Sequence, residues 1–250
     1  MTKIILSGCF GRMGKTLQEM IALNDDSEVV AGVDIALQSA PFPVYQNISG
    51  VKEKADVIID FSNPSTLDAL LAFAKSTKTP LVLATTGYSE EQINDIKEAA
   101  KTVPIFFSFN MSLGVNLILG LAKKATEILG DGFDIEIIEK HHNQKVDAPS
   151  GTAIMIANAI DEVKGNSIYE YDRHSKRQKR ASNEIGIHSV RGGTIVGEHE
   201  VIFAGEDEIV SIKHLATSRK IFATGALKAA IYLSKVKTAG LYNMNDLING

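Results

Sequence analysis

Short apolar runs alternate with longer stretches of helical periodicity over the first 110 residues of the chain. Residues 13–23, 65–75 and 90–101 repeat apolar positions every three or four residues, as amphipathic helices do. Alternating strands and helices are typical of βαβ units around a parallel sheet. The pattern therefore predicts a doubly wound parallel sheet with helices on both faces. The five expected strands are residues 3–7, 29–33, 57–61, 81–84 and 105–107.

The pattern changes after residue 110. Residues 113–129 are apolar enough for a long buried helix, and residues 133–139 alternate with the period of two of a half-buried strand. A second helix is expected at residues 151–163, before a polar and charged stretch at residues 164–183. Glycine-containing turns then separate strand-like stretches in the manner of antiparallel hairpins. These expected strands are residues 185–190, 194–203 and 208–214.

The sequence thus indicates two domains of the α/β class. The first is a Rossmann-like, doubly wound parallel sheet, and the second is an α+β domain with a mixed or antiparallel sheet. A length of 250 residues is sufficient for both. The chain closes with an alanine-rich helix at residues 222–233, and we expect the C-terminal segment, residues 219–250, to pack back on the first domain.

The charge balance argues against a general attraction to polyanions. Lysines and arginines total 26 against 30 aspartates and glutamates, which gives a net charge of −4. The chain therefore has no global field that draws nucleic acid or anionic lipid. The basic run at residues 176–180 lies in a polar stretch of an acidic chain, so we interpret it as a solvated loop. Neither nucleic acid nor a membrane is an expected partner.

Cysteine usage and hydropathy indicate a cytoplasmic protein. The one cysteine, Cys9, cannot form an internal disulfide or a cysteine-based zinc site, and it fits a reducing compartment. The apolar stretch at the N-terminus is too short for a secretory signal, so no targeting segment is expected. Residues 102–122 are uncharged over about the length of a bilayer span. Their serines, asparagines and glycines favour a strand, a polar loop and a helix instead.

A glycine-rich turn follows the first expected strand, with Gly8, Gly11 and Gly14 in GxxGxxG spacing. Such a turn lets the backbone approach a pyrophosphate closely and presents the N–H groups of a helix N-terminus to it. Glycines also end strands for purely conformational reasons. A nucleotide site is favoured because Asp34 ends the second strand about 20 residues later, where a carboxylate accepts a hydrogen bond from an adenosine ribose hydroxyl.

The residues around Asp34 also bear on the choice of nicotinamide cofactor. A carboxylate repels the 2′-phosphate of NADPH, and residues 35–37 contain no arginine to attract it, which favours NADH. Arg12 and Lys15 on the first turn of the helix keep NADPH open. Doubly wound sheets bind ligands at the carboxyl ends of their strands. Further strand ends at that edge are residues 61–62, 85–87 and 108–111.

The densest chemical signal lies in residues 139–153, EKHHNQKVDAPSGTA. His141, His142 and Lys145 are residue types that handle carboxylates and a proton. Ser150 is an N-cap candidate, so that the amides after it would be available to hold a carboxylate oxygen. In an extended chain His141 and Lys145 would be roughly 13 Å apart. A shared site therefore requires a loop between them.

Each part of this segment also has a structural interpretation. The alternatives are that Ser150 only caps a helix, that the histidines are metal ligands or surface residues, and that Lys145 is a solvated side chain. A metal site is disfavoured, and none is expected, because no cysteine lies nearby and adjacent histidines on a strand point to opposite faces. Later polar groups that either complete an anion pocket or decorate the hairpins are residues 191–193, residues 197–200, His214 and Arg219.

Together these motifs resemble those of the dihydrodipicolinate reductase family along nearly the whole chain. The longest match is His141-His142-x-x-Lys145-x-Asp147-Ala148-Pro149-Ser150-Gly151-Thr152-Ala153. The resemblance implies a homotetramer that reduces a small cyclic dicarboxylate to tetrahydrodipicolinate with NADH or NADPH, in lysine and diaminopimelate biosynthesis. It implies that residues 1–110 bind the dinucleotide, while residues 111–218 bind the substrate and form the oligomer. The other matching segments are residues 8–14, residues 60–62 with Pro64, residues 85–87, residues 110–116 and residues 195–199.

The resemblance also implies residue roles. His141 and Lys145 would be the catalytic acid–base residues, and which of them delivers the proton stays open. Carboxylates of the substrate would be bound by His142, Ser150, Gly151 and Thr152. The cofactor-binding residues implied are Gly8, Cys9, Phe10, Gly11, Arg12, Met13, Asp34, Ala84, Thr85, Thr86, Ser108, Phe109, Asn110 and Met111.

Two other functions remain open at this level. A dehydrogenase of an amino acid such as aspartate shares the Rossmann-like domain, but it gives no reason for the two histidines and the lysine. A module that senses NADH without chemistry would need a partner surface, for which the sequence shows no amphipathic or basic candidate.

Overall fold

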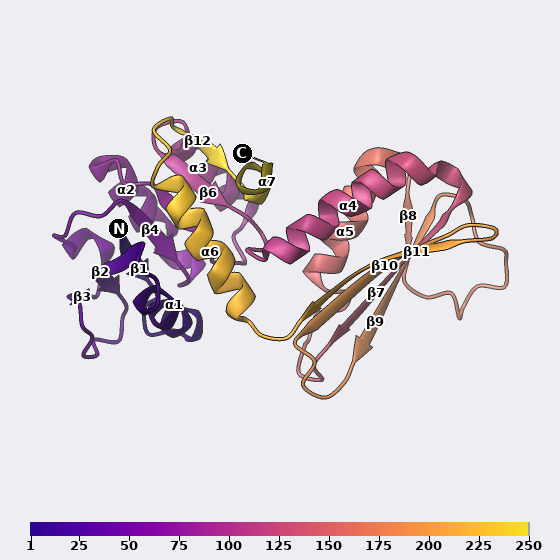
Figure 1. The fold of residues 1–250 in the computed structure, drawn as a ribbon, viewed down its shortest axis with the longest axis horizontal. Coiled ribbons are helices and arrows are strands. Elements are labelled where there is room, and N and C mark those ends of the chain that lie inside the picture. The colour runs from indigo at the N-terminus through magenta and orange to yellow at the C-terminus, as the bar shows by residue number, and fades with distance from the viewer. Residues whose placement is uncertain (250) are drawn as a thin grey trace. The chain divides into compact units, whose positions relative to one another are not determined.

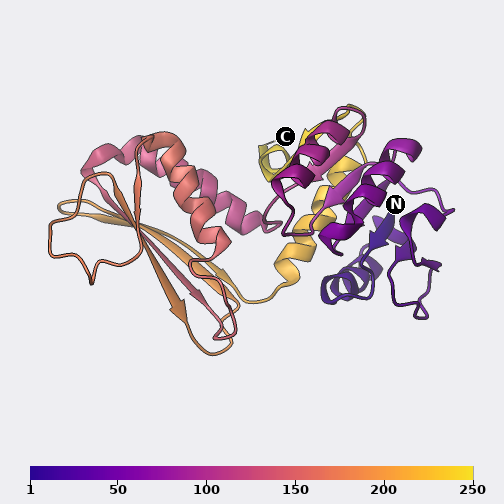
Figure 2. The ribbon, with the colours of Figure 1, turned by 180° about the vertical axis from the view of Figure 1, so that it is seen from behind.

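The computed structural model describes residues 1–249 and divides them into two compact units (Figures 1 and 2). Met1–Leu113 and the residues from Lys220 onward form the first unit, and Gly114–Arg219 form the second. No helix in the described part of the chain is both long and apolar enough to cross a membrane.

The first unit is built on a seven-stranded sheet in which all strands are parallel. The strand order is β12-β6-β5-β4-β1-β2-β3. All five expected strands are present, and the prediction missed only the two edge strands, β3 and β12, which are too short to show a periodic pattern. The strands are β1 (Thr2–Ser7), β2 (Ser27–Val33), β3 (Val44–Tyr45), β4 (Val57–Asp60), β5 (Leu81–Leu83), β6 (Pro104–Phe107) and β12 (Gly240–Tyr242).

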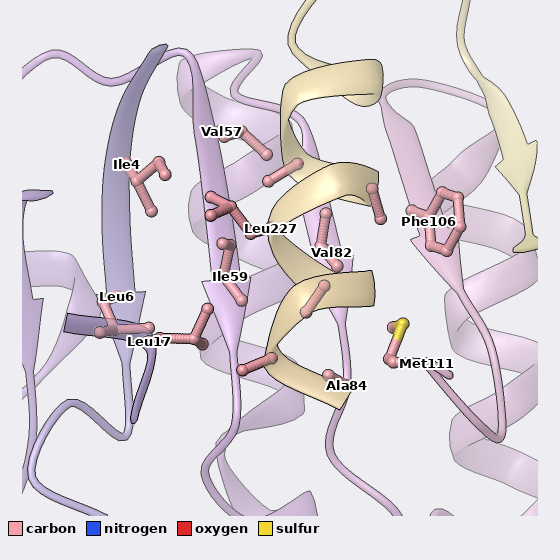
Figure 3. Packing of buried hydrophobic residues seen from close by; sticks show 14 of the residues in the cluster. Ile4, Leu6, Leu17, Val57, Ile59, Val82, Ala84, Phe106, Met111 and Leu227 are labelled. Atoms are coloured by element: carbon pink, nitrogen blue, oxygen red, sulfur yellow. The ribbon is translucent and has the colours of Figure 1, made fainter. Parts of the chain in front are cut away.

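Alternate residues of this sheet pack against helices on its two faces. Ile4 and Ile59 face α1 and α6, whereas Ile5 and Ile58 face α2 and α3. Figure 3 shows α6 lying across the strands, with Leu227 directed toward them. A parallel sheet buried on both faces explains why its strands read as continuous apolar runs. The helices are α1 (Arg12–Ala22), α2 (Leu67–Thr77), α3 (Glu90–Ala100), α6 (Lys220–Leu233) and α7 (Met244–Asn249), with short 3-10 helices η1 (Ile48–Gly50) and η2 (Pro64–Thr66).

The second unit is a mixed five-stranded sheet with two helices on one face. Its order is β11-β10-β7-β9-β8, with β7, β9 and β8 mutually parallel and β10 antiparallel to both of its neighbours. Apolar side chains of β7, β9 and β10 pack against α4 and α5. The elements are α4 (Leu113–Leu129), η3 (Gly130–Gly132), β7 (Asp134–His141), α5 (Gly151–Lys164), β8 (Ile168–Glu170), β9 (Glu184–Arg191), β10 (Gly197–Ala204) and β11 (Ile209–Ala216).

The expected fold class is confirmed, but one of the two predicted hairpins is wrong. Strands β10 and β11 form the expected antiparallel hairpin. Strands β9 and β10 do not pair, because β7 lies between them and bonds to both. A glycine-containing turn specifies that the chain reverses, not which strand it meets next. The alternating strand β7, with Ile135 and Ile137 on its buried face, takes the central place instead.

Candidate active site

The glycine-rich turn lies between β1 and α1, at the carboxyl edge of the seven-stranded sheet. Gly8 has a φ of +75°, and a Cβ there would lie 2.4 Å from the carbonyl oxygen of Phe61. A Cβ on Gly14 would lie 2.1 Å from the carbonyl oxygen of Gly8. These two glycines are therefore required by backbone packing. Gly11 is exposed at the N-cap of α1, where a Cβ would meet only the Gly8 oxygen, at 3.3 Å.

Asp34 holds this turn from the end of β2. Its Oδ2 accepts a hydrogen bond from the amide of Phe10 at 2.9 Å, and its Oδ1 accepts one from the amide of Ala36 at 3.0 Å. The carboxylate thus fixes the turn before any ribose hydroxyl reaches it. Ile35 and Leu37 beside it are exposed. The residues that directly follow Asp34 are therefore uncharged and supply no cation for a 2′-phosphate.

Cys9 belongs to the turn, but its side chain belongs to the core. It is fully buried among the apolar residues under α1 and α6. Burial, with a smaller effect of the Asp34 charge, raises the pKa of the thiol to about 11. Its carbonyl oxygen accepts a hydrogen bond from Gln18 Nε2 at 2.6 Å. The side chain and the carbonyl oxygen of Cys9 are therefore already engaged within the protein and do not face a cofactor.

The ends of β4, β5 and β6 line a pocket of about 290 Å³ together with α1 and α6. It brings together seven of the expected cofactor residues and Phe61, which lies at a strand end expected at this edge; its remaining lining residue, Phe222, was not expected. Phe222 had no detectable signal, because it lies on a helix more than a hundred residues away in sequence. The seven expected residues are Met13, Ala84, Thr86, Ser108, Phe109, Asn110 and Met111.

Thr85 is turned away from that pocket and into a buried network around Asp60. Its hydroxyl donates to Asp60 Oδ2 at 2.6 Å and accepts from the amide of Ser62 at 2.9 Å. Asp60 is fully buried, and this burial raises its pKa against the opposing effect of the surrounding hydroxyls. The network ties the end of β4 to the end of β5. Thr85 therefore stabilises the edge of the sheet through its hydrogen bond to Asp60, and its hydroxyl group is used in this network.

The second unit carries the histidine-rich segment at the end of β7. Glu139 and His141 share the buried face of this strand with Ile135 and Ile137. His141 Nδ1 lies 2.6 Å from Glu139 Oε2. Burial alone would raise the pKa of Glu139, but hydrogen bonds from Arg191, His141 and Ser189 outweigh it and lower the pKa to about 2. Because the carboxylate is ionised, we assign the Nδ1 proton to His141.

The environment of His141 favours the neutral imidazole near pH 7. Burial lowers its pKa, Glu139 opposes this, and the charges of Lys145 and Arg191 lower it further. With Nδ1 bound to Glu139, Nε2 is the nitrogen left for chemistry. A Cβ on Gly197 would lie 3.2 Å from Nε2, so the glycine in β10 leaves space beside that nitrogen.

The expected loop between His141 and Lys145 is present. Residues 142–150 leave β7 and include a turn in which the amide of Lys145 donates to the carbonyl of His142 at 3.2 Å. Lys145 Nζ lies 2.8 Å from Asp147 Oδ1, and its side chain is mostly buried. Since the Lys145 charge acts on the pKa of His141, the loop brings the two side chains into one electrostatic environment.

Ser150 caps α5 as expected. Its Oγ accepts from the amide of Ala153 at 3.1 Å and hydrogen bonds with His199 Nε2 at 2.9 Å. Its own amide donates to Glu139 Oε1 at 3.1 Å. Ser150 is thus engaged on both sides, and a carboxylate would meet the amides of the first turn after it. A Cβ on Gly151 would have nothing within 4 Å, so the backbone there is open to approach.

Two of the later polar groups join this cluster. Arg191 binds Glu139, and His199 packs edge-on against His141 with ring centroids 5.1 Å apart. Burial, the largest effect, lowers the pKa of His199 to about 4, so its imidazole is neutral. His214 pairs with His199 across β10 and β11, while Arg219 is exposed. The sequence prediction included Glu139 in the segment 139–153 but gave no role to it, although its carboxylate contacts both His141 and Arg191.

The described residues do not form a cluster of three or more His, Cys, Asp or Glu side chains able to hold a metal ion. Two residues of the basic run at 176–180 form ion pairs, while Arg177 and Lys179 are exposed. Lys176 pairs with Glu170, and Arg180 pairs with Glu136 and Asp134.

Both parts of the chain match a single enzyme family. Residues 2–111 match "Dihydrodipicolinate reductase, N-terminus", and residues 114–248 match "Dihydrodipicolinate reductase, C-terminus". A 4-hydroxy-tetrahydrodipicolinate reductase from Clostridium novyi (strain NT) is 51% identical over 250 residues, which cover 99% of this chain and 98% of that one. The enzyme of the same name from Caldanaerobacter subterraneus subsp. tengcongensis is 53% identical over 249 residues, with 99% and 98% covered.

Solved structures separate this family from its structural neighbours. A dihydrodipicolinate reductase from Paenisporosarcina sp. TG-14, with dipicolinate bound, is 26% identical with a TM-score of 0.82, and the match covers 98% of this chain and 99% of that one. An aspartate dehydrogenase from Thermotoga maritima is 12% identical with a TM-score of 0.53 over 95% and 99% of the two chains, which shows a shared fold alone. The chain therefore belongs to the dihydrodipicolinate reductase family, whose members are oxidoreductases that use NADH or NADPH.

Proposed function

We propose that His141 and Lys145 supply the acid–base chemistry with which this chain reduces 4-hydroxy-tetrahydrodipicolinate to tetrahydrodipicolinate, in lysine and diaminopimelate biosynthesis. The observation that carries the proposal is the buried Glu139–His141 pair, whose Nε2 side faces the space beside Gly197 while the Lys145 charge acts on the same ring. Bound NADH or NADPH supplies the hydride. The 4-hydroxyl group of the substrate leaves as water, which gives the conjugated imine. Arrival of the hydride builds negative charge on this imine, which the Lys145 ammonium stabilises, and one of the two side chains delivers the proton.

The start of α5 is the part suited to the substrate carboxylates. The amides of Gly151 and Thr152 belong to the first helical turn, where the backbone and the helix dipole favour an anion. His142 and Lys145 lie on the loop that leads into this turn. Ser150 contributes by holding the turn in place. The dipicolinate bound to the relative from Paenisporosarcina, itself a cyclic dicarboxylate, supports the class of ligand.

We assign cofactor binding to residues 1–110 with the C-terminal segment 219–250, which correspond closely to the first unit, Met1–Leu113 and the residues from Lys220 onward. The residues present fit a dinucleotide: the turn at Gly11 is open, Asp34 stands at the end of β2, and the 290 Å³ pocket lies at the carboxyl edge of the sheet. Residues 111–218 then bind the substrate. A reducing, cytoplasmic location suits the protein, since its one cysteine is a buried free thiol.

We expect variants of the two acid–base residues to lose turnover. His141→Gln and Lys145→Ala should each lower kcat by about 100-fold or more, the contribution of a positioned acid or base. Their affinity for NADH should stay within about twofold of wild type, because neither residue belongs to the first unit. Oxidation of NADH, with substrate generated in place from pyruvate and aspartate semialdehyde by a synthase, measures kcat. His174→Gln is the control, since His174 is exposed; unchanged kcat in both test variants would exclude the proposal.

The surface beside Asp34 predicts the cofactor preference. We expect kcat/KM for NADH to equal or exceed that for NADPH, because Asp34 repels a 2′-phosphate and residues 35–37 carry no positive charge. Replacing the exposed Ala36 by Arg should raise kcat/KM for NADPH while leaving that for NADH little changed. The same assay with each cofactor measures both values. A clear preference of the wild-type enzyme for NADPH would contradict this prediction.

Two glycines of the glycine-rich turn allow its role in cofactor binding to be tested separately from its role in folding. Gly11→Ala should weaken NADH binding by about tenfold or more, because its Cβ points from the exposed N-terminus of α1, and should barely change the melting temperature. Gly14→Ala should prevent stable folding, since its Cβ would overlap the Gly8 carbonyl. Fluorescence titration and thermal unfolding measure the two effects. A Gly11→Ala variant with wild-type affinity would show that the turn is purely structural.

We also propose that the chain forms a homotetramer through the five-stranded sheet. The face opposite α4 and α5 carries Leu215, Glu198, Lys140 and Val190 side by side across four strands. Leu215 is 55% exposed, Val190 44%, and Ile209, further along β11, 69%. Exposed apolar side chains gathered on one sheet face favour association.

Sedimentation tests this assembly. We expect a mass four times the 27.0 kDa of one chain. Leu215→Glu should shift the mass to smaller species, because it replaces an exposed apolar side chain by a negative charge beside Glu198. Leu23→Glu, at an exposed position of the first unit, is the control and should leave the mass unchanged. A monomeric wild type, or a Leu215→Glu variant that remains tetrameric, would argue against this interface.

A further inference from the structure

One buried carboxylate collects hydrogen bonds from three separate elements of the second unit. Glu139 is fully excluded from solvent. Its oxygens lie 2.8 and 2.6 Å from the two terminal nitrogens of Arg191, 2.6 Å from His141 Nδ1 and 3.1 Å from the amide of Ser150. These donors come from β9, from β7 and from the start of α5. A buried charge persists only where such donors surround it.

The same ion pair also braces the loop that carries Lys145. Arg191 Nη2 donates to the carbonyl of Asp147 at 2.8 Å, in the middle of residues 142–150. Glu139 holds the side chain of His141 at the beginning of that loop and the amide of Ser150 at its end. The loop is therefore fixed at both ends and at one interior point by Glu139 and Arg191.

We infer that Glu139, together with Arg191, is a positioning residue of the reaction. Its carboxylate fixes the ring and the tautomer of His141 and, through the amide of Ser150, the first turn of α5. A single side chain thereby sets both the proton-handling residue and the turn that receives the substrate carboxylates. This inference rests on the proposed roles of His141 and of the α5 turn.

The charges around His141 give the inference a measurable consequence. Arg191 and Lys145 face the ring with positive charge, His199 packs against it as a neutral imidazole, and Glu139 supplies the opposing negative charge. Without that charge, Arg191 and Lys145 act on His141 unopposed, so its pKa falls. The proton on Nδ1 also loses its ionised acceptor, so the Nε2-protonated tautomer gains population.

The test is Glu139→Gln, with Glu184→Gln as the matched control. Glu184 is also buried in this unit and also pairs with an arginine, Arg173, but it does not contact the histidine cluster. NMR of the imidazole nitrogens reports the pKa and tautomer of His141 without relying on activity, and its resonances are assigned with His141→Gln. In Glu139→Gln we expect a lower pKa, a shift toward the Nε2-protonated tautomer and a kcat lowered about 10- to 100-fold. The pH at which activity depends on His141 should fall with that pKa, and NADH affinity should not change.

Arg191→Lys is the second test of the inference, for the case in which Glu139→Gln fails to fold. It keeps a positive charge beside Glu139 but loses the forked bond and the contact with Asp147. We expect it to keep the His141 tautomer and to raise KM for the dicarboxylate, because the loop is less firmly held. Unchanged kcat and KM in this variant would overturn the inference.

Other results separate this inference from the proposed function. A folded Glu139→Gln variant with an unchanged His141 pKa and tautomer overturns the inference, whatever its kcat. The same holds if Glu184→Gln reproduces the NMR changes. If the nitrogens shift as expected but His141→Gln retains full turnover, the positioning stands and the proposed role of His141 fails.

Discussion

The second unit depends on a negative charge that has been taken out of water. Glu139 is stable as a carboxylate because an arginine fork, an imidazole N–H and a backbone amide replace its hydration. Asp60 in the first unit is a buried carboxyl group with different partners. It is equally buried but is surrounded by hydroxyls, and its pKa is raised instead of lowered. The partners thus decide the direction of the pKa shift: Glu139 can orient and stabilise a histidine, whereas Asp60 ties two strand ends together.

Most of the first unit is encoded locally, which is why its pattern could be interpreted from the sequence. Strands such as β4 are short apolar runs bounded by turns, and α4 in the second unit matches its expected limits. The edge strand β12 has three residues and acquires its identity only by pairing with β6. Likewise, the partner of β9 is set by the distant strand β7. Pairings between distant segments leave no local periodicity, so the sequence could not supply them.

The candidate site also combines residues that a local motif reveals with residues that only distant contacts bring in. The glycine-rich turn, Asp34 and the segment around His141 were found because each is a local motif with its own chemistry. Phe222 reaches the cofactor-side pocket from the far end of the chain, and nothing near it in sequence signals that. Glu139 was included in that segment without a role, although a signal for its burial existed. It occupies the same alternating positions as Ile135 and Ile137, so the period that placed them in the core placed a charge there too.

The helix N-termini show how the chain reserves amides for ligands. Helix α3 has a full capping box from Ser89 and Gln92, with Glu90 and Glu91 in its first turn, so its amides and its dipole are already satisfied. Helix α1 begins at Gly11, which has no side chain to accept from those amides, and its first turn carries no acid. A phosphate is the acceptor that such a terminus favours. Helix α5 lies between these extremes, since its cap engages one amide and no acid follows. Of these three helices, the two that we propose to receive anionic groups are the two whose first turn carries no acid.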